Sequence, residues 1–225
     1  MDVDFTKLDQ YDHDRVLGYY DTYIRKHLKS DTILLATGTD CDTMIDLYLK
    51  YPDSIKGFGE IKCYDHNTDK NGNTIRLPYG NLQWIRPLCD FNSKVGLPIF
   101  IHWSVYNKDR KDELDRLLSE YPSIPFVLCH CGMSRHYDIH SQYTRVMDLM
   151  LKHGNLYVDV SFDAAEFLLQ HLDYLKTLDG RCFLGTDLNP KCMRHDGWDK
   201  PLSTFKQLYE IRLRYNHTIK KLFGL

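Results

Sequence analysis

The sequence lacks the features of a membrane, secreted or nucleic-acid-binding protein. No apolar run among its 225 residues is long enough to span a bilayer. The N-terminal segment has no basic stretch followed by an apolar one, so no secretory signal is expected. Long runs of Lys or Arg are absent, and the formal net charge is −2. We therefore expect neither a nucleic-acid nor a membrane partner, and we predict a small-molecule substrate.

Disulfide and zinc-finger patterns are also missing. The chain has seven cysteines, an odd number, and their spacing is not that of a disulfide framework. Cys129 and Cys131 flank His130, but no second Cys/His pair follows at a zinc-finger distance. Because free thiols are typical of reducing compartments, we expect a cytoplasmic protein.

Nothing in the sequence divides it into parts. It has no internal repeat, low-complexity tract or interdomain linker, and its hydrophobic content of 43% is enough for one sizeable core. Residues 1–225 are therefore predicted to form a single domain. The 13% aromatic content would allow an apolar interface, so a homodimer is compatible with the sequence.

The chain instead alternates apolar runs of strand length with patterns of helical period. The runs predicted as strands are Thr32–Thr37, Ile55–Cys63, Ile99–Trp103, Phe126–His130, Leu156–Ser161 and Cys182–Asp187. Helical spacing separates them, as in Leu114, Leu117 and Leu118. Segments that leave the strands, such as Tyr64–Gly80 and Ser104–Asp112, are longer and more polar than those that enter them. This pattern predicts a parallel sheet with right-handed crossovers.

The predicted fold class is α/β, a (β/α)8 TIM-like barrel in which the long exit loops build the active face. A closed barrel has eight strands and commonly about 250 residues, whereas only six strands are predicted in this sequence. We therefore expect the barrel to be abbreviated or to lack its first βα unit.

Three of the predicted strands lead to a residue that can bind a metal or move a proton. His102, His130 and Asp187 each follow an apolar run, and the C-terminal ends of barrel strands converge on one mouth. Two imidazoles and a carboxylate at that mouth would form a hydrolytic metal site. Each residue alone also fits a structural role, either a core histidine bonded to a backbone carbonyl or, for Asp187, a helix N-cap or Asx turn.

Four further residues are candidates for the same site. Glu60 and Lys62 share one face of the predicted strand Ile55–Cys63. Glu60 could bridge or polarise a metal and Lys62 could hold a substrate carboxylate, or the two could form a simple ion pair on an edge strand. Trp103 and Arg135 follow the two histidines and could line the substrate pocket, or they could pack within their loops.

Several segments together resemble the amidohydrolase-related proteins, a branch of the amidohydrolase superfamily. These segments are Leu97–Trp103, Asp115–Pro122, Pro125–Gly132, Asn155–Ser161, Arg181–Asp187 and Tyr215–Phe223. They follow the order of the family, and the resemblance covers about residues 55–225.

The resemblance implies a distorted (β/α)8 barrel that holds a divalent metal, usually zinc. His102 would be the metal ligand from the fifth strand, and Asp187 the eighth-strand aspartate that binds the metal and handles the proton of the attacking water. His130 would be a second-metal ligand or a catalytic acid/base. Glu60 or Lys62 would lie near the position that bridges metals in some branches.

The sequence departs from this family at the first strand, where the family has a His-x-His pair that supplies two metal ligands. No His-x-His occurs anywhere in the chain. Asp2 and Asp4 have the matching spacing, and carboxylates also bind zinc. Either the metal is held by the other candidates, His102, His130 and Asp187 with Glu60, or the chain is a truncated or inactive relative.

Together these observations predict a metal-dependent hydrolase that acts on a small carboxylate, lactone or amide through metal-activated water. Asp187 would accept the proton, and His130 would stabilise the oxyanion or protonate the leaving group. One alternative is a nonoxidative decarboxylase on the same metal, with His130 and Arg135 handling the acid. The other is a metal-free barrel that binds a small molecule or a partner without catalysis.

Overall fold

The computed structural model describes residues 34–37, 40–63, 66–68, 74–76, 82–133, 137–160, 167–168, 170–171, 180–184, 218 and 221–223. Its main sheet consists, in spatial order, of β1 (Leu34–Ala36), β2 (Ile55–Lys62), β5 (Ile99–His102), β6 (Phe126–Leu128), β7 (Leu156–Val160) and β8 (Cys182–Leu184). Every neighbouring pair is parallel, and the spatial order follows the order along the chain. In the described part of the chain the sheet is open, with β1 and β8 at its edges.

This arrangement confirms the predicted fold class, an α/β fold of the TIM-like barrel type. Parallel strands in sequential order, with helices between them, are the building units of that fold. The six strands of the sheet correspond to the six runs predicted from the sequence, and β1, β2, β5 and β6 end one or two residues earlier than predicted. The predicted start of the first run and the predicted ends of the last two lie outside the described residues. An antiparallel hairpin of β3 (His66–Thr68) and β4 (Thr74–Arg76) was not predicted, and it lies within the segment expected to be an exit loop.

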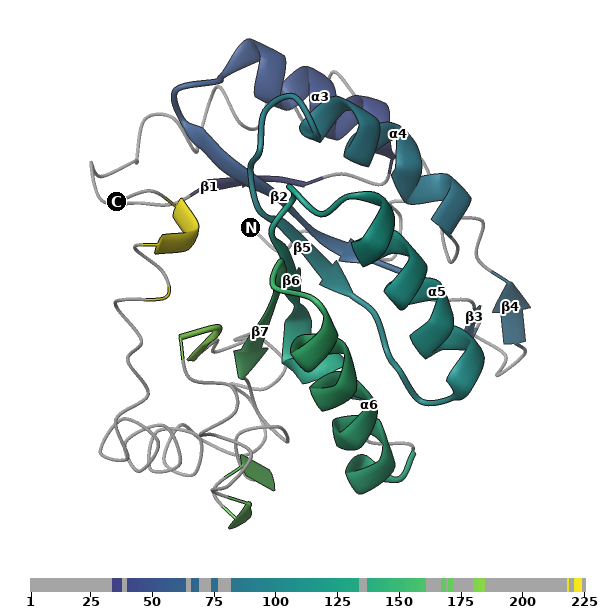
Figure 1. Ribbon diagram of the computed structural model, residues 1–225. Helices are drawn as coiled ribbons and strands as arrows, with labels where there is room; N and C mark the ends of the chain where they lie inside the picture. Colours follow the sequence, from purple (N-terminus) through teal and green to yellow (C-terminus); the bar gives the residue numbers. More distant parts are fainter. Residues whose placement is uncertain are drawn as a thin grey trace, which may run out of the picture.

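In the part of the chain that the structure describes, four helices cover one side of the sheet (Figure 1). They are α3 (Cys41–Lys50), α4 (Leu82–Asn92), α5 (Lys108–Glu120) and α6 (Ile139–Lys152). Helix α5 begins where the Asn107 side chain accepts a hydrogen bond from the backbone N–H of Arg110 at 2.9 Å. That cap converts the second half of the predicted loop Ser104–Asp112 into the first turn of α5. None of the helices in the described residues is long and apolar enough to cross a lipid bilayer.

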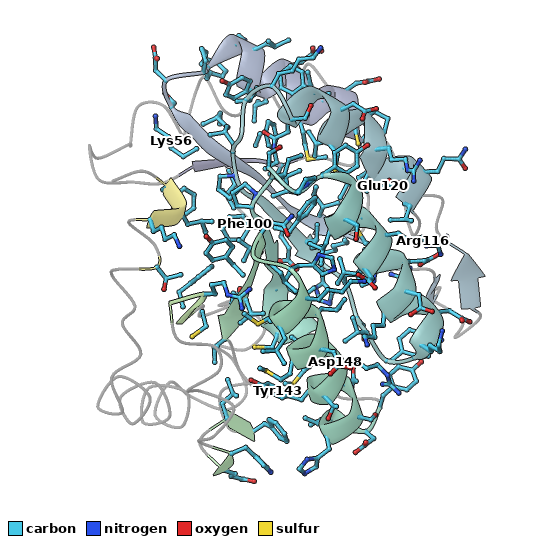
Figure 2. All side chains as sticks on the ribbon, in the orientation of Figure 1. Lys56, Phe100, Arg116, Glu120, Tyr143 and Asp148 are labelled. Atoms are coloured by element: carbon cyan, nitrogen blue, oxygen red, sulfur yellow. The ribbon has the colours of Figure 1, made fainter. Side chains whose placement is uncertain are left out.

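Side chains on both faces of β5 are buried, which explains its continuous apolar character. Ile99 and Ile101 belong to the larger core, which includes the buried leucines of α5. Phe100 points to the other face, where its ring centroid lies 6.1 Å from those of Phe183 in β8 and Phe223 near the C-terminus. Figure 2 shows Phe100 on the side of the sheet away from the exposed side chains of α5. Burial of each such side chain contributes about 1.5–3 kcal/mol.

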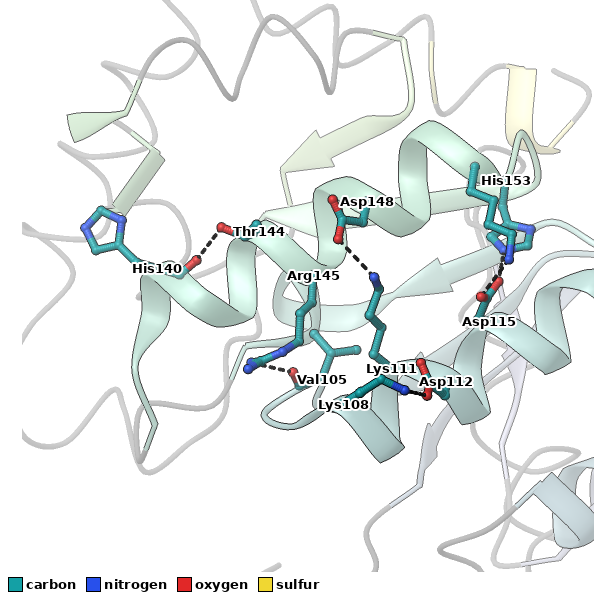
Figure 3. Close-up of polar contacts among 11 residues, drawn as sticks. Val105, Lys108, Lys111, Asp112, Asp115, His140, Thr144, Arg145, Asp148 and His153 are labelled. Carbon is teal, nitrogen blue, oxygen red and sulfur yellow. Dashed lines mark hydrogen bonds and ion pairs between the residues drawn. The ribbon is translucent and has the colours of Figure 1, made fainter.

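Helices α5 and α6 are joined by ion pairs across their exposed faces (Figure 3). Lys111 contacts Asp148 at 2.9 Å and Lys152 contacts Asp115 at 2.7 Å near the surface, whereas His153, whose side chain is buried, contacts Asp115 at 2.5 Å. Exposed pairs of this kind contribute little individually. These ion pairs hold together the two helices that follow the exit segments of β5 and β6, and candidate site residues lie in those segments.

Candidate metal centre

Three of the predicted site residues come together at the C-terminal edge of the sheet. His102 is the last residue of β5, Glu60 lies in β2, and His130 follows the end of β6. His102 Nδ1 lies 2.7 Å from Glu60 Oε1, and His130 Nε2 lies 3.5 Å from the same oxygen. The two imidazole rings meet edge to face, with centroids 4.8 Å apart. The parallel register accounts for the contact between Glu60 and His102, because Lys62, two residues after Glu60 in β2, is paired with His102 in β5.

The backbone before Glu60 requires glycine. Gly59 has a φ of 122°, and a Cβ atom at this position would lie 2.4 Å from the carbonyl oxygen of Phe100. A side chain therefore cannot be accommodated without a shift of β2 or β5. The close approach of the two strands brings the Glu60 carboxylate within reach of the histidine at the end of β5.

His130 lies in a short 3-10 turn, Cys129–Gly132, and not in a strand. The prediction that the strand continues to His130 was wrong, because β6 ends at Leu128 and both His130 and Cys131 adopt left-handed backbone conformations with φ near 54° and 53°. The turn is connected to β7 by a long hydrogen bond, in which the His130 backbone N–H donates to Asp159 Oδ1 at 3.4 Å. A left-handed residue other than glycine costs about 1–3 kcal/mol, and such residues are concentrated at functional sites.

The electrostatics of the cluster favour an ionised carboxylate. Burial of Glu60 raises its pKa, but hydrogen bonds from His102 and His130 and the charges of the two imidazoles outweigh that effect. The net result is a pKa well below the usual range of a glutamate. Glu60 therefore carries a negative charge at neutral pH and can act as a ligand or a hydrogen-bond acceptor.

The donor set suits a divalent metal ion. One potential ligand atom from each of Glu60, His102 and His130 can be chosen so that all three lie within 4.8 Å of one another. Within the described ranges this is the one group of three His, Cys, Asp or Glu side chains with that property. Two imidazole nitrogens and one carboxylate oxygen match the ligand types of catalytic zinc sites that have three protein ligands.

The other predicted site residues have different positions. Lys62 is exposed on the same face of β2 as Glu60, since the intervening Ile61 is buried. Trp103 is fully buried and its indole N–H donates to the Arg110 carbonyl at 3.0 Å, so the structure gives it a packing role. A direct contact of Trp103 with substrate stays a prediction. Asp187 and Arg135 lie outside the described residues, as do Asp2 and Asp4.

Arg110 is a residue near the site that sequence reasoning missed. It is only 5% exposed, and its guanidinium stacks on the Trp103 ring at 4.1 Å. The helical spacing contained a signal, because Arg110 lies four residues before Leu114 and so shares the apolar face of α5. An arginine on an apolar helix face indicates a buried charge with specific partners.

Comparisons with known proteins concern the family and the fold of the chain. A family model described as amidohydrolase matches residues 66–210, well over half of the chain. The match includes His102, His130 and Asp187, and it begins after Glu60 and Lys62. No curated protein sequence matches.

Several solved structures share the fold. An amidohydrolase from Burkholderia multivorans with bound HEPES has a TM-score of 0.63 at 13% identity, covering 94% of this chain and 80% of that one. A putative 2-pyrone-4,6-dicarboxylic acid hydrolase from Pseudomonas putida has a TM-score of 0.56 at 19% identity, covering 92% and 87%. A dihydroorotase from Campylobacter jejuni has a TM-score of 0.54 at 11% identity, covering 94% and 71%. At these identities the likeness establishes the fold.

Proposed function

The chain belongs to the amidohydrolase family, and from that premise we propose that it is a metal-dependent hydrolase. The observation that carries the proposal is the convergence of Glu60, His102 and His130, whose potential ligand atoms lie within 4.8 Å of one another. These side chains would hold the ion, and Asp187, which lies outside the described residues, would complete the site. Zinc is the first candidate because the donor set combines imidazoles with a carboxylate.

When bound, a divalent ion supplies Lewis acidity toward a substrate carbonyl and lowers the pKa of water to near neutrality. The protein groups would perform the remaining tasks. Asp187 would accept a proton from the attacking water. His130 has two alternative roles: it would bind the ion through a ring nitrogen, or, with Glu60, His102 and Asp187 holding the ion, it would donate a hydrogen bond or a proton to the oxygen or nitrogen that leaves. His130 is well placed for the second role because its backbone is fixed in a turn and its ring is 17% exposed.

The substrate that we propose is a small carboxylate, lactone or amide. Lys62 is exposed on the face of β2 that also carries Glu60, so its ammonium could bind a substrate carboxylate beside the metal. One protein of similar fold is named as a putative hydrolase of a dicarboxylic acid, 2-pyrone-4,6-dicarboxylic acid. That name supports a carboxylate-bearing substrate for a site of this type.

A metal-free binding protein is the second candidate. It is favoured by the absence of any His-x-His pair and by the Glu60–His102 contact of 2.7 Å, which gives each group a polar partner in the absence of an ion. A decarboxylase on the same site is a variant of the first proposal, and measurement of carbon dioxide release from substrate carboxylates would separate it from a hydrolase.

Metal analysis tests the proposal. The protein is purified without added zinc, and its metal content is measured by mass spectrometry after gel filtration. We expect about one divalent ion per chain in the wild type and a loss of about 10-fold or more in His102→Ala, because one of a small number of ligands is removed. His140→Ala is the matched control, since His140 is exposed on α6. Wild-type protein without metal would favour the metal-free candidate, and full metal content in His102→Ala would contradict the ligand assignment.

The state of the cysteines supports a proposal about where the protein is located. The six cysteines that the structure describes are all buried and free of disulfides. We therefore propose a cytoplasmic location, which detection of the protein in fractionated cells would test.

A further inference from the structure

Arg110 is a charged side chain buried in the first turn of α5. It is 5% exposed, whereas the preceding residues Lys108 and Asp109 are exposed. Burial of an arginine is costly unless its charge and its N–H groups find partners. An apolar residue at this position would pack against the sheet without that cost, so the contacts of the guanidinium indicate what the arginine contributes.

The guanidinium contacts two residues that directly follow strands of the sheet. Its Nη2 donates to the Cys63 carbonyl oxygen at 2.5 Å, and its Cζ lies 4.1 Å from the centroid of the Trp103 ring. The Trp103 indole N–H in turn donates to the Arg110 carbonyl at 3.0 Å. Glu113 partly compensates the charge through a contact of 3.0 Å with Nη1. Burial raises the pKa of the Cys63 thiol to about 12, so this thiol is protonated at neutral pH and offers no negative charge to Arg110.

These contacts surround the exits of β2 and β5, the two strands that carry Glu60 and His102. Cys63 is the first residue after β2, and Trp103 is the first residue after β5. The two exits are also joined directly, because the Cys63 N–H donates to the His102 carbonyl at 3.0 Å. Arg110 therefore completes a ring of contacts around both strand ends.

A connection at this point is needed because the pairing of β2 with β5 is irregular beside Glu60. The register shifts between Phe58 and Ile61, so the ladder is interrupted where the Glu60 backbone lies. Regular pairing returns only at Ile61 and Lys62. The hydrogen bond of Arg110 to the Cys63 carbonyl holds β2 on the far side of the interruption.

We propose that Arg110 is a positioning residue that ties the exits of β2 and β5 together and thereby keeps the Glu60 carboxylate in contact with the His102 imidazole. Its effect on metal binding rests on the function proposed above, whereas its effect on the Glu60–His102 contact does not. The role requires arginine because a planar guanidinium can stack on Trp103 and donate to the Cys63 carbonyl at once, and the ammonium of a lysine cannot.

The first experiment uses metal-free protein. Because a carboxylate only accepts hydrogen bonds, the His102 Nδ1 carries the proton in the contact with Glu60. This proton gives a downfield signal in the proton NMR spectrum. The signal is assigned by its change in the Glu60→Gln variant. We expect the signal in the wild type and its loss or clear shift in Arg110→Met. Arg145→Met is the matched control, since Arg145 also donates to carbonyl oxygens after β5, those of Val105 and Tyr106 at 3.3 and 3.0 Å, but from helix α6 (Figure 3). An unchanged signal in Arg110→Met would overturn the proposal.

The second experiment measures zinc affinity by competition with a chelator. Residues that orient metal ligands typically change affinity by about 10–100-fold when they are replaced. We expect a loss of that size in Arg110→Met relative to Arg145→Met, at similar thermal stability of the metal-free proteins. Affinities within about threefold of each other would overturn the effect on the metal.

The role of Arg110 can still be tested if the wild type binds no metal or if Arg110→Met does not fold. If the wild type binds no metal, the proposed function fails, and the NMR signal alone decides the role of Arg110. If Arg110→Met does not fold, Arg110→Lys is measured instead, because it retains the charge and the aliphatic stem without the planar fork. A wild-type signal and affinity in Arg110→Lys would contradict the proposal.

Discussion

The left-handed backbone of His130 predicts that replacing alanine by glycine changes the free energy of unfolding in opposite directions at positions 130 and 102. His130 has a φ of 54° in the turn after β6, whereas His102 has strand conformation at the end of β5. Both side chains are largely buried, at 17% and 21% exposure, and both contact Glu60. Each position is replaced by alanine and by glycine, and the two replacements at one position are compared. Both variants at a position lack the imidazole, so its loss cancels in the difference between their free energies of unfolding.

The expected magnitudes follow from backbone energetics. At position 130, alanine pays about 1–2 kcal/mol for left-handed geometry, which glycine avoids, while glycine loses about 0.5–1 kcal/mol more conformational entropy on folding. Alanine to glycine should therefore stabilise the protein there by about 0.5–1 kcal/mol. At position 102 only the entropy term operates, so the same change should destabilise by about 0.5–1 kcal/mol. The two positions should differ by about 1–2 kcal/mol, with opposite signs.

Equilibrium unfolding in urea measures these differences. All four variants are studied in the presence of a chelator, so that metal binding does not contribute to stability. If the change from alanine to glycine destabilised the protein by a similar amount at both positions, the reasoning would be refuted. Such a result would mean that residue 130 has no conformational strain from a left-handed backbone in solution.

Two further predictions concern stability. Gly59→Ala should destabilise strongly, with loss of several degrees or more in Tm, because its Cβ would lie 2.4 Å from a carbonyl oxygen of β5; Gly96→Ala, also at positive φ but with no atom within 4 Å, should cost much less. Burial raises the pKa of Asp115, but hydrogen bonds and charges from Lys152 and His153 lower it more, so the net shift is downward. The stability from this group should be present above the unfolded pKa of about 3.9 and be lost as pH falls through the folded pKa. Asp115→Asn should therefore flatten the acid side of a stability-against-pH curve, and an unchanged acid limb would contradict the ion pairs.

Much of the fold was predictable because its signals are local. The six apolar runs correspond to the six strands of the sheet, and the residue that ends β5, His102, was recognised because a polar side chain closes an apolar run. Helix α5 was predicted from its leucine spacing, but its first turn was assigned to a loop because Asn107 was not recognised as the cap. The β3–β4 hairpin was missed because its two strands contain a single apolar side chain, Ile75, so neither strand appears as an apolar run in the sequence.

Three of the predicted site residues lie together in the structure, but the geometry of their contacts was not predicted. The sequence alone placed His102 and His130 at the ends of predicted parallel strands, which share one edge of the sheet, and it placed Glu60 within the predicted strand Ile55–Cys63. It did not reveal that His130 sits in a turn or that the carboxylate lies between both imidazoles. Those features depend on contacts between residues that are far apart in the chain.

By itself, therefore, the sequence determined which segments form the strands of the main sheet and that His102 ends one of them, because hydrophobic period and strand length are properties of neighbouring residues. Only the tertiary structure decided that Trp103 packs beneath Arg110, that β2 shifts register beside Glu60, and that the three candidate ligands meet. The physical reason is that these outcomes are set by the close packing of β2, β5 and α5, where a few ångströms decide which donor reaches which acceptor.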